Sequence, residues 1–196
     1  SGLAPAIVAG HSLGEVAALA VAGLLTPEDA IELAAERGRL MAEATARAPG
    51  GMIAVTGAAA RDAAIACGGA AGTIAVAAQN APEEWVLSGD DAALRAVVAS
   101  VPCTRLRVAG PWHSPAMAPA AAALRDAVGR WSRYPARVPL VLSTTGELAP
   151  ELDPIVLVAE SLTRPLRWTL ALSTLAARQV DTIVTCGPGK VLASLC

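Results

Sequence analysis

The chain is poor in aromatic residues and in lysine. Its 196 residues include no Phe, one Tyr, and Lys190 as the single lysine. The 15 basic and 17 acidic residues are scattered, and the formal net charge is −2. Proteins that bind nucleic acids need a basic surface that follows the phosphates, so this class is excluded. Charges, Pro or Gly interrupt every apolar run before the ~20 residues of a membrane-spanning helix, which excludes a membrane protein.

The four cysteines form neither a metal-binding nor a disulfide pattern. They are widely separated, without a CxxC pair, at positions Cys67, Cys103, Cys186 and Cys196. Zinc sites need closely spaced ligands and disulfide frameworks need paired cysteines, so we expect no bound metal and reduced thiols. The chain also has no charged start followed by an apolar segment, which is the pattern of an export signal. These absences favour a cytoplasmic protein.

Helices and strands alternate at both ends of the sequence. The apolar run 5–9 predicts a buried strand, and the Ala/Leu-rich segment 15–25 predicts a helix. Thr26 followed by Pro27 predicts the start of a second helix, which the Pro-Gly-Gly sequence at 49–51 ends. The elements predicted after residue 110 are helices at 114–131, 154–162 and 166–179, strands at 138–143 and 182–186, and a turn at 187–189 into a last helix. This alternation predicts an α/β body with a mostly parallel sheet.

The middle of the chain has a different pattern. Its predicted strands are 52–56, 73–78, 85–88 and 104–109, and its predicted helices are 59–67 and 90–100. The order strand-helix-strand-strand-helix-strand is that of the ferredoxin-like fold. We therefore expect residues 51–110 to form an inserted α+β subdomain. Residues 1–50 and 111–196 would then form the large α/β subdomain.

A nucleophile is predicted where the first strand meets the first helix. Gly10-His11-Ser12-Leu13-Gly14 has the GxSxG spacing of a nucleophile elbow, in which small residues permit the strained turn that exposes the serine hydroxyl. The string also occurs by chance, but its position between a predicted strand and a predicted helix favours a nucleophilic Ser12. A serine hydroxyl needs a base, whose assistance is worth roughly 10²–10⁴-fold in rate.

The sequence offers two histidines as candidate bases. His11 is next to Ser12 in the elbow, where adjacent side chains point to different sides, so we expect it to pack or to form hydrogen bonds. His113 lies in a loop that Pro111 and Pro115 stiffen, which suits a fixed imidazole. Acids such as Asp90 between Ser12 and His113 fit helix caps or exposed faces. The sequence therefore favours a Ser/His dyad in which a backbone carbonyl holds the imidazole.

Arg37 occupies an apolar face of the second predicted helix. The residues of this face are Ala30, Leu33, Ala34, Arg37, Leu40, Met41 and Ala44. A buried guanidinium is costly unless an anion meets it. Two interpretations remain open: an internal salt bridge or extended side chain, and a planar fork that grips a substrate carboxylate. The second interpretation would place Arg37 opposite Ser12.

Several motifs, in this order, resemble those of the malonyl-CoA:acyl carrier protein transacylase family, which includes the acyltransferase domains of polyketide synthases. They span nearly the whole chain and are Gly10-His11-Ser12-Leu13-Gly14-Glu15, Glu36-Arg37-Gly38-Arg39-Leu40-Met41, Gln79-Asn80-Ala81-Pro82 with Ser88-Gly89, Trp112-His113-Ser114-Pro115-Ala116-Met117, Leu162-Thr163-Arg164-Pro165-Leu166-Arg167-Trp168, and Gly187-Pro188-Gly189-Lys190-Val191-Leu192. The resemblance implies a hydrolase-like, three-layer α/β subdomain with a ferredoxin-like insertion.

The resemblance also implies a reaction and its partners. Ser12 would attack the thioester of an acyl-CoA donor such as malonyl-CoA, while His113 takes its proton. The acyl group would then pass to the phosphopantetheine thiol of an acyl carrier protein, with no bound cofactor. By the same resemblance, the Leu13 N–H binds the oxyanion and the Ser161 carbonyl orients His113. The residues implied to bind substrate are Arg37, His11, Met41, Asn80 and Trp112.

Departures from the family pattern leave alternatives open. The family's initial strand and its glycine- and glutamine-rich loop have no match before residue 5. Trp112 stands where Phe often accompanies malonyl substrates, so malonyl or a branched relative remains possible. Glu83-Glu84-Trp85 replaces a Gly-Gln-apolar stretch, and Ser161 replaces a Gln. The rival hypotheses are an editing acyl hydrolase with the same Ser/His pair and a folded, inactive fragment. The resemblance implies an enzyme of fatty acid or polyketide assembly, and a place within a larger multidomain synthase is left open.

Overall fold

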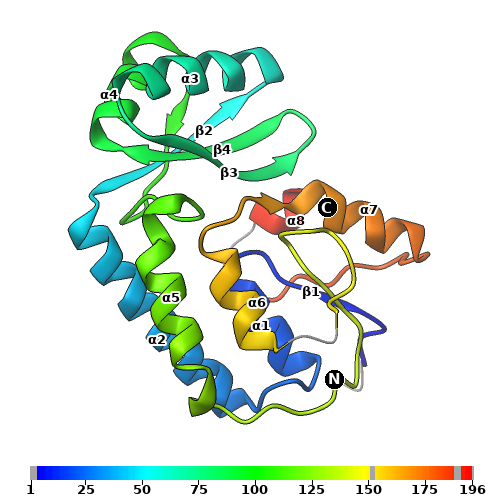
Figure 1. Cartoon of the computed structure of the whole chain (residues 1–196). Coiled ribbons are helices and arrows are strands. Elements are labelled where there is room, and N and C mark those ends of the chain that lie inside the picture. The colour runs from blue at the N-terminus through cyan, green and yellow to red at the C-terminus, as the bar shows by residue number, and fades with distance from the viewer. Residues whose placement is uncertain (1–3, 151–152, 188–190, 196) are drawn as a thin grey trace.

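The computed structural model describes residues 4–150, 153–187 and 191–195. In Figure 1, a sheet covered by two helices lies at the top, and a group of packed helices lies below it. The chain starts in the helical part, enters the sheet through α2, and returns through α5. The candidate functional residues come from both parts, so the contacts between them decide how the site is built.

The N-terminal segment forms β1 (Val8–Ala9), α1 (Leu13–Val21) and α2 (Pro27–Arg47). α2 begins where the sequence predicts. The Thr26 hydroxyl oxygen accepts a hydrogen bond from the Asp29 N–H at 3.0 Å, and Pro27 lacks an N–H that would need a partner. α2 packs against α1 and α5, and its buried face includes Leu33 and Leu40.

The middle of the chain forms a sheet with two helices on one face (Figure 1). Its elements are β2 (Gly50–Thr56), α3 (Ala58–Ala71), β3 (Ile74–Ala81), β4 (Glu84–Asp90), α4 (Asp91–Ser100) and β5 (Thr104–Arg105). This is the expected order, and the strands lie antiparallel as β5-β2-β4-β3. Ile53, Leu87 and Leu94 are fully buried between the sheet and the helices. The assignment of residues 51–110 to a separate subdomain stays a prediction.

One strand of this sheet comes from outside that segment. β7 (Leu166–Arg167) pairs parallel with β3, so that Ala78 lies opposite Leu166 and Gln79 opposite Arg167. The sequence predicted a helix from residue 166, which is wrong for these two residues, because α7 (Trp168–Ala177) begins only after them. A two-residue strand has no periodicity of its own, and pairing with β3 determines its conformation.

The other predicted strands of the α/β body are short. Of the buried strand predicted at 5–9, only β1 forms, and it is half-buried. Of the strand predicted at 138–143, only β6 (Leu140–Val141) forms. β1 and β6 pair parallel, with Val8 opposite Leu140. Among the described residues, the expected parallel sheet therefore consists of two-residue pairings, and the larger sheet is mostly antiparallel.

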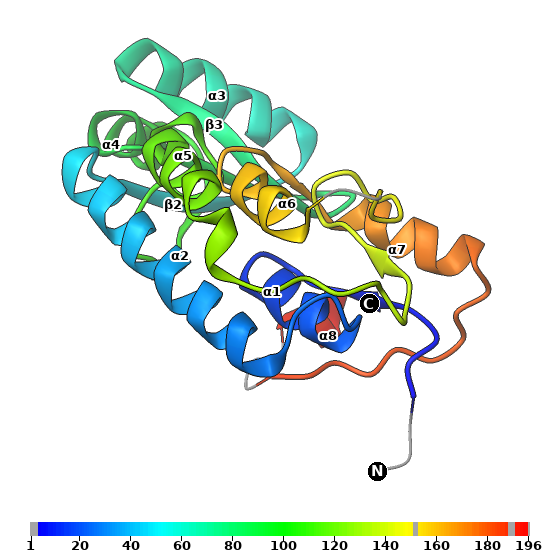
Figure 2. The ribbon, with the colours of Figure 1, turned by 60° about the horizontal axis from the view of Figure 1, so that its bottom comes forward.

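The predicted buried strand at 182–186 is wrong. Residues 181–187 are exposed and contain no strand; Ile183 and Val184 are 44% and 70% exposed. Figure 2 shows this segment running along the edge of the molecule after α7. β-branched residues favour a strand only where a neighbouring strand offers hydrogen bonds, and none of the described strands pairs with this segment. Most of the predicted turn at 187–189 lies outside the described residues, and α8 (Val191–Leu195) follows it.

The predicted helix at 114–131 is divided into η1 (Pro115–Met117), α5 (Ala118–Asp126) and η2 (Val128–Arg130). Pro119 lies in the first turn of α5, where its missing N–H costs nothing, so the helix starts again there. α6 (Pro154–Ser161) matches its prediction closely and packs against α5. None of the helices in the described part of the chain combines the length and the apolarity needed to cross a membrane.

The Thr26 cap gives a test of how α2 is held. Thr26→Ala removes the acceptor of the Asp29 N–H, and we expect a loss of about 1 kcal/mol in the free energy of unfolding. Urea denaturation followed by circular dichroism measures this loss. Thr182→Ala, in the exposed segment after α7, is the matched control and should leave the midpoint unchanged. Equal midpoints for the two variants would show that the cap does not stabilise α2.

Candidate active site

The elbow has the strained backbone that its sequence predicts. Ser12 lies between β1 and α1 with φ 55° and ψ −112°, a conformation that residues other than glycine rarely adopt. A Cβ on Gly10 would lie 2.2 Å from the carbonyl carbon of Gly14, so only glycine fits there. Gly14 itself has open space in front of its Cα. The close approach of these two glycines turns the Ser12 side chain away from the strand and the helix.

His113 is in hydrogen-bond contact with Ser12. The Ser12 Oγ to His113 Nε2 distance is 2.8 Å, and His113 Nδ1 lies 2.8 Å from the carbonyl oxygen of Ser161 at the end of α6. A carbonyl only accepts, so Nδ1 carries the proton and Nε2 is the acceptor for the Ser12 hydroxyl. This is the tautomer that a general base needs. Asp90 caps α4 as expected. The expectation that all acids between Ser12 and His113 are caps or exposed is wrong for Glu15, which is 1% exposed.

Burial keeps the His113 imidazole neutral. The side chain is 4% exposed, and desolvation lowers its pKa to about 4, with a further lowering by the Arg37 charge. The hydrogen bond to the Ser161 backbone acts in the opposite direction. A neutral imidazole at pH 7 can accept the Ser12 proton at once, and the imidazolium that results is a strong acid toward a leaving group.

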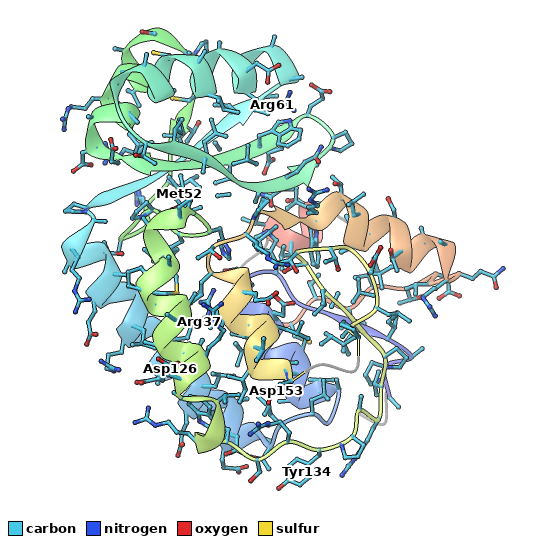
Figure 3. The ribbon with its side chains drawn as sticks, viewed as in Figure 1. Arg37, Met52, Arg61, Asp126, Tyr134 and Asp153 are labelled. Atoms are coloured by element: carbon cyan, nitrogen blue, oxygen red, sulfur yellow. The ribbon has the colours of Figure 1, made fainter. Side chains whose placement is uncertain are left out.

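Arg37 lies beside the nucleophile. Its Nη2 donates to Ser12 Oγ at 3.2 Å, and the side chain is only 5% exposed. Figure 3 shows Arg37 in the interior of the helical part, whereas Tyr134 lies at its edge. Burial lowers the pKa of Arg37 to about 10, so the guanidinium remains charged at neutral pH. Its Nε–H is buried without a hydrogen-bond partner among the described residues, which leaves donor capacity for an anion.

Glu15 is a buried carboxyl to which the sequence analysis gave no role. It is 1% exposed, and its Oε2 accepts a hydrogen bond from the Ser143 hydroxyl at 3.1 Å. Burial raises the pKa of Glu15 to about 7, while hydrogen bonds from Ser143 and the positive charge of Arg37 act to lower it. Glu15 lies in the first turn of α1, three residues after Ser12.

The substrate-binding residues that the resemblance implied lie around this centre in different ways. His11 Nε2 lies 2.9 Å from Asn80 Oδ1, and the His11 ring meets Trp168 edge-on with 5.5 Å between centroids. Asn80 Nδ2 also donates to Glu84 Oε1 at 3.2 Å. Asn80 belongs to β3, so this contact joins the elbow to the sheet. Desolvation lowers the pKa of His11, which keeps it neutral as well.

Met41, Trp112 and Leu13 complete the set. Met41 is 5% exposed and packs in the helical core, one turn after Arg37. Trp112 precedes His113, packs against the cores of both the helices and the sheet, and accepts a hydrogen bond from the Ser88 hydroxyl through its carbonyl oxygen. The Leu13 N–H opens α1 and has no acceptor among the described residues, so it is available to an oxyanion.

No group of three or more His, Cys, Asp or Glu side chains in the described part of the chain could hold a metal ion. What the geometry brings together is a hydroxyl, a neutral imidazole, a buried cation and a free helix N–H. Such a set can form and break an ester or thioester through an acyl-serine intermediate. The cation beside the hydroxyl further suits an acyl group that carries a negative charge close to its carbonyl.

The chain is similar to known proteins. The family model described as "Acyl transferase domain" matches residues 1–189. The chain is 32% identical over 212 residues to a malonyl CoA-acyl carrier protein transacylase of Bacillus subtilis, covering 100% of this chain and 65% of that protein. It is 33% identical to the spectinabilin polyketide synthase system protein NorB of Streptomyces orinoci, covering 99% of this chain and 9% of that protein.

A solved structure is similar over the whole chain. It contains a malonyl-transacylase in complex with a type II polyketide synthase acyl-carrier protein, and the TM-score is 0.90 at 28% identity. The match covers 100% of this chain and 66% of that one. The likeness confirms the expected α/β fold class. The chain thus spans about two thirds of the length of this neighbour and of the Bacillus relative.

Glu15 makes the stability of the protein depend on pH. Its pKa is about 7 in the folded state against 4.5 ordinarily, so the folded protein binds more protons than the unfolded chain between these values. Stability is therefore lost as pH rises from about 5 to 7 and is not regained above 7. The shift corresponds to about 3 kcal/mol. Glu15→Gln keeps an acceptor for Ser143 and has no charge to bury.

We therefore expect the stability of Glu15→Gln to rise relative to that of the natural protein between pH 5 and pH 8, by up to about 3 kcal/mol. Urea denaturation at both pH values measures the difference. Glu32→Gln removes an exposed carboxyl on α2 and is the control, whose difference from the natural protein should stay constant. A constant difference for Glu15→Gln as well would mean that Glu15 is not a costly buried charge.

Proposed function

The chain belongs to the acyl transferase domain family, and from this premise we propose that it moves a malonyl-type acyl group from coenzyme A to the phosphopantetheine thiol of an acyl carrier protein. One observation carries the proposal: a buried guanidinium lies 3.2 Å from the hydroxyl of the nucleophile. An acetyl group or a simple fatty acyl group has no charge that could meet this cation.

The first half of the reaction forms an acyl-serine. The Ser12 oxygen attacks the thioester carbonyl while its proton passes to His113 Nε2, 2.8 Å away. The carbonyl oxygen becomes an oxyanion, which the Leu13 N–H stabilises. The carbon–sulfur bond then breaks, the coenzyme A thiolate takes the proton from His113, and the neutral imidazole is restored. The Ser161 carbonyl holds the Nδ1 proton throughout and stabilises the imidazolium between the two steps.

The second half reverses these steps with a different thiol. The phosphopantetheine thiol gives its proton to His113 and attacks the acyl-serine, and Ser12 leaves with the proton returned by His113. A related malonyl-transacylase has been solved in complex with an acyl-carrier protein, which supports a carrier protein as the acceptor. Relatives named as a malonyl CoA-acyl carrier protein transacylase and as a polyketide synthase system protein support a place in fatty acid or polyketide assembly. Membership of a larger synthase, and the cytoplasmic location, stay predictions.

Arg37 supplies selectivity. In a malonyl thioester a single methylene separates the carboxylate from the carbonyl carbon, so a carboxylate gripped beside Ser12 Oγ leaves the carbonyl within reach of attack. The guanidinium then has two donors for two carboxylate oxygens: Nη2, now on Ser12, and the unpartnered Nε–H. Holding the acyl group in this way favours the carrier thiol over water, because the carbonyl face is kept in a dry site.

The remaining predicted site residues have supporting roles in this proposal. His11 is fixed by Asn80 and lies next to Ser12, where it lines the acyl site. Met41 lies one turn after Arg37, and Trp112 directly precedes His113. Their apolar surfaces shape the space beside the acyl chain. Trp112 is the residue from which we expect a choice between malonyl and branched acyl groups.

Acyl-serine formation is the direct test of the reaction. After addition of malonyl-CoA, intact mass spectrometry should show a malonyl adduct that Ser12→Ala abolishes. His113→Ala should slow its formation by roughly 10²–10⁴-fold, the usual value of base assistance. Ser100→Ala removes an exposed hydroxyl at the end of α4 and should form the adduct normally. When holo-carrier protein is added, the malonyl group should pass from Ser12 to the carrier protein. Release of free malonate instead would support a hydrolase. A well-folded protein that forms no adduct would contradict catalysis.

Selectivity tests the role of Arg37. Arg37→Ala should lower kcat/KM for malonyl-CoA by about tenfold to a hundredfold while sparing acetyl-CoA, because hydrogen bonds to charged groups are worth about 1.5–3 kcal/mol. Rates with both donors give the ratio, and the acetyl rate reports whether the variant is folded. Arg47→Ala, at the exposed end of α2, should leave the ratio unchanged. A malonyl preference that survived Arg37→Ala would place the carboxylate elsewhere.

A further inference from the structure

Glu15 is a buried ionisable group that the proposed reaction does not use. It is 1% exposed and lies one turn of α1 after Ser12, to whose carbonyl oxygen its own N–H donates at 3.0 Å. Buried carboxylates are costly unless a cation or hydrogen bonds compensate them. The Ser143 hydroxyl supplies one hydrogen bond. The Ser143 backbone supplies another. The remaining compensation is the charge of Arg37, whose Nη2 lies 3.2 Å from Ser12 Oγ and which attracts the carboxylate without a direct hydrogen bond among the described contacts.

Within the described part of the chain, Arg37 is the one charge that acts on Glu15. α2 contributes Arg37. His11 in the elbow and His113 in the loop after β5 are both kept neutral by burial. On α6, Glu160 forms an ion pair with Arg164 at 3.2 Å, away from this centre. β1 carries no ionisable side chain, and the side chain of Arg167 on β7 is exposed. Among the residues that the structure describes, Arg37 and Glu15 are therefore the charge pair of this interior.

A carboxylate substrate disturbs this pair. When a malonyl carboxylate reaches Arg37, two negative groups share one guanidinium in a region that excludes water. Like charges that share a buried site cannot both stay ionised cheaply, and one of them gains a proton. The malonyl carboxylate meets the donors of Arg37 directly, whereas Glu15 has only the Ser143 hydrogen bonds. Glu15 is the group that must change.

We propose that Glu15 is the resident counter-ion of Arg37 and takes up a proton from solvent when a substrate carboxylate binds to that arginine. Glu15 is then a positioning residue, because it holds the empty site charge-balanced and releases Arg37 to the substrate. The inference rests on the proposed function, since it needs an acyl group that bears a carboxylate. The raised pKa of Glu15, about 7, means that the protonated form is within reach at neutral pH.

Hydrogen bonds beyond Glu15 connect it with the rest of the site. Ser143, which binds the Glu15 carboxylate, accepts a hydrogen bond from the Arg167 N–H through its own carbonyl oxygen at 2.6 Å. Arg167 pairs with Gln79 in the sheet, and the next residue, Asn80, holds His11. Protonation of Glu15 thus occurs within a closed ring of contacts around the elbow, and the neutral acid can keep its place against Ser143.

Binding calorimetry tests the proton uptake. The probe is a malonyl-CoA analogue with a methylene in place of the thioester sulfur, which cannot acylate Ser12. Titrations in two buffers of different ionisation enthalpy should show nearly one proton taken up per analogue at pH 8 and little at pH 6. The affinity should fall about tenfold from pH 6 to pH 8, because only the protonated fraction of Glu15 is ready to bind.

The controls separate Glu15 from other groups. The acetyl analogue carries the same phosphates without the carboxylate and should show no such uptake. Glu15→Gln should bind the malonyl analogue without proton uptake and with an affinity equal at pH 6 and pH 8, whereas Glu32→Gln should behave like the natural protein. Uptake that persists in Glu15→Gln, or malonyl binding without uptake in the natural protein, would overturn the inference and leave the proposed function standing.

A second variant serves if Glu15→Gln does not fold. Ser143→Ala removes a hydrogen bond that stabilises the charged carboxylate, so the pH at which uptake begins should move upward. An unchanged pH profile would exclude Glu15 as the proton acceptor. If the natural protein does not bind the malonyl analogue and is not acylated by malonyl-CoA, both the proposed function and this inference are contradicted.

Discussion

The buried guanidinium of Arg37 is the constraint on which the site depends. A cation that is 5% exposed inside a helical core must be held by a long, well-anchored element, and α2 supplies this with its Thr26 cap and its contacts to α1 and α5. The same charge acts on its neighbours, because it lowers the pKa of His113 and stabilises ionised Glu15. One buried charge thus favours a neutral base, a polarised nucleophile and a compensating carboxyl together.

Very short strands position the reacting groups around that cation. β1 and β6, with two residues each, lie at the base of the elbow, and β7 connects the end of α6, where the Ser161 carbonyl orients His113, to the sheet through β3. These pairings are too small to stabilise a sheet by themselves. Their function is to fix register: β7 places Arg167 opposite Gln79, so that Asn80 reaches His11. The contact between the helical part and the sheet is therefore part of the site.

The sequence predicted what is local and missed what depends on distant partners. The elbow, the cap of α2 and the apolar face that carries Arg37 each follow from a few adjacent residues, and all are present. The strand predicted at 182–186 is absent, and β7 lies in a segment for which the sequence predicts a helix, because strand formation depends on a partner that the sequence does not identify. Glu15 lies in the first turn of a helix, where a carboxylate usually faces solvent, so its burial against Ser143 follows only from the three-dimensional structure.

Backbone strain falls on the two residues that would react. Three non-glycine residues of the described chain have positive φ, and two of them are Ser12 and His113, each at 55°. Such conformations cost about 1–3 kcal/mol each and persist only where the surroundings enforce them. Here the contact of Gly10 with Gly14 enforces the first, and the Ser161 carbonyl with the burial of the imidazole enforces the second. The packing of the core therefore keeps the nucleophile and the base aligned, with Ser12 Oγ 2.8 Å from His113 Nε2, before any substrate binds. The sequence motifs alone do not specify this alignment.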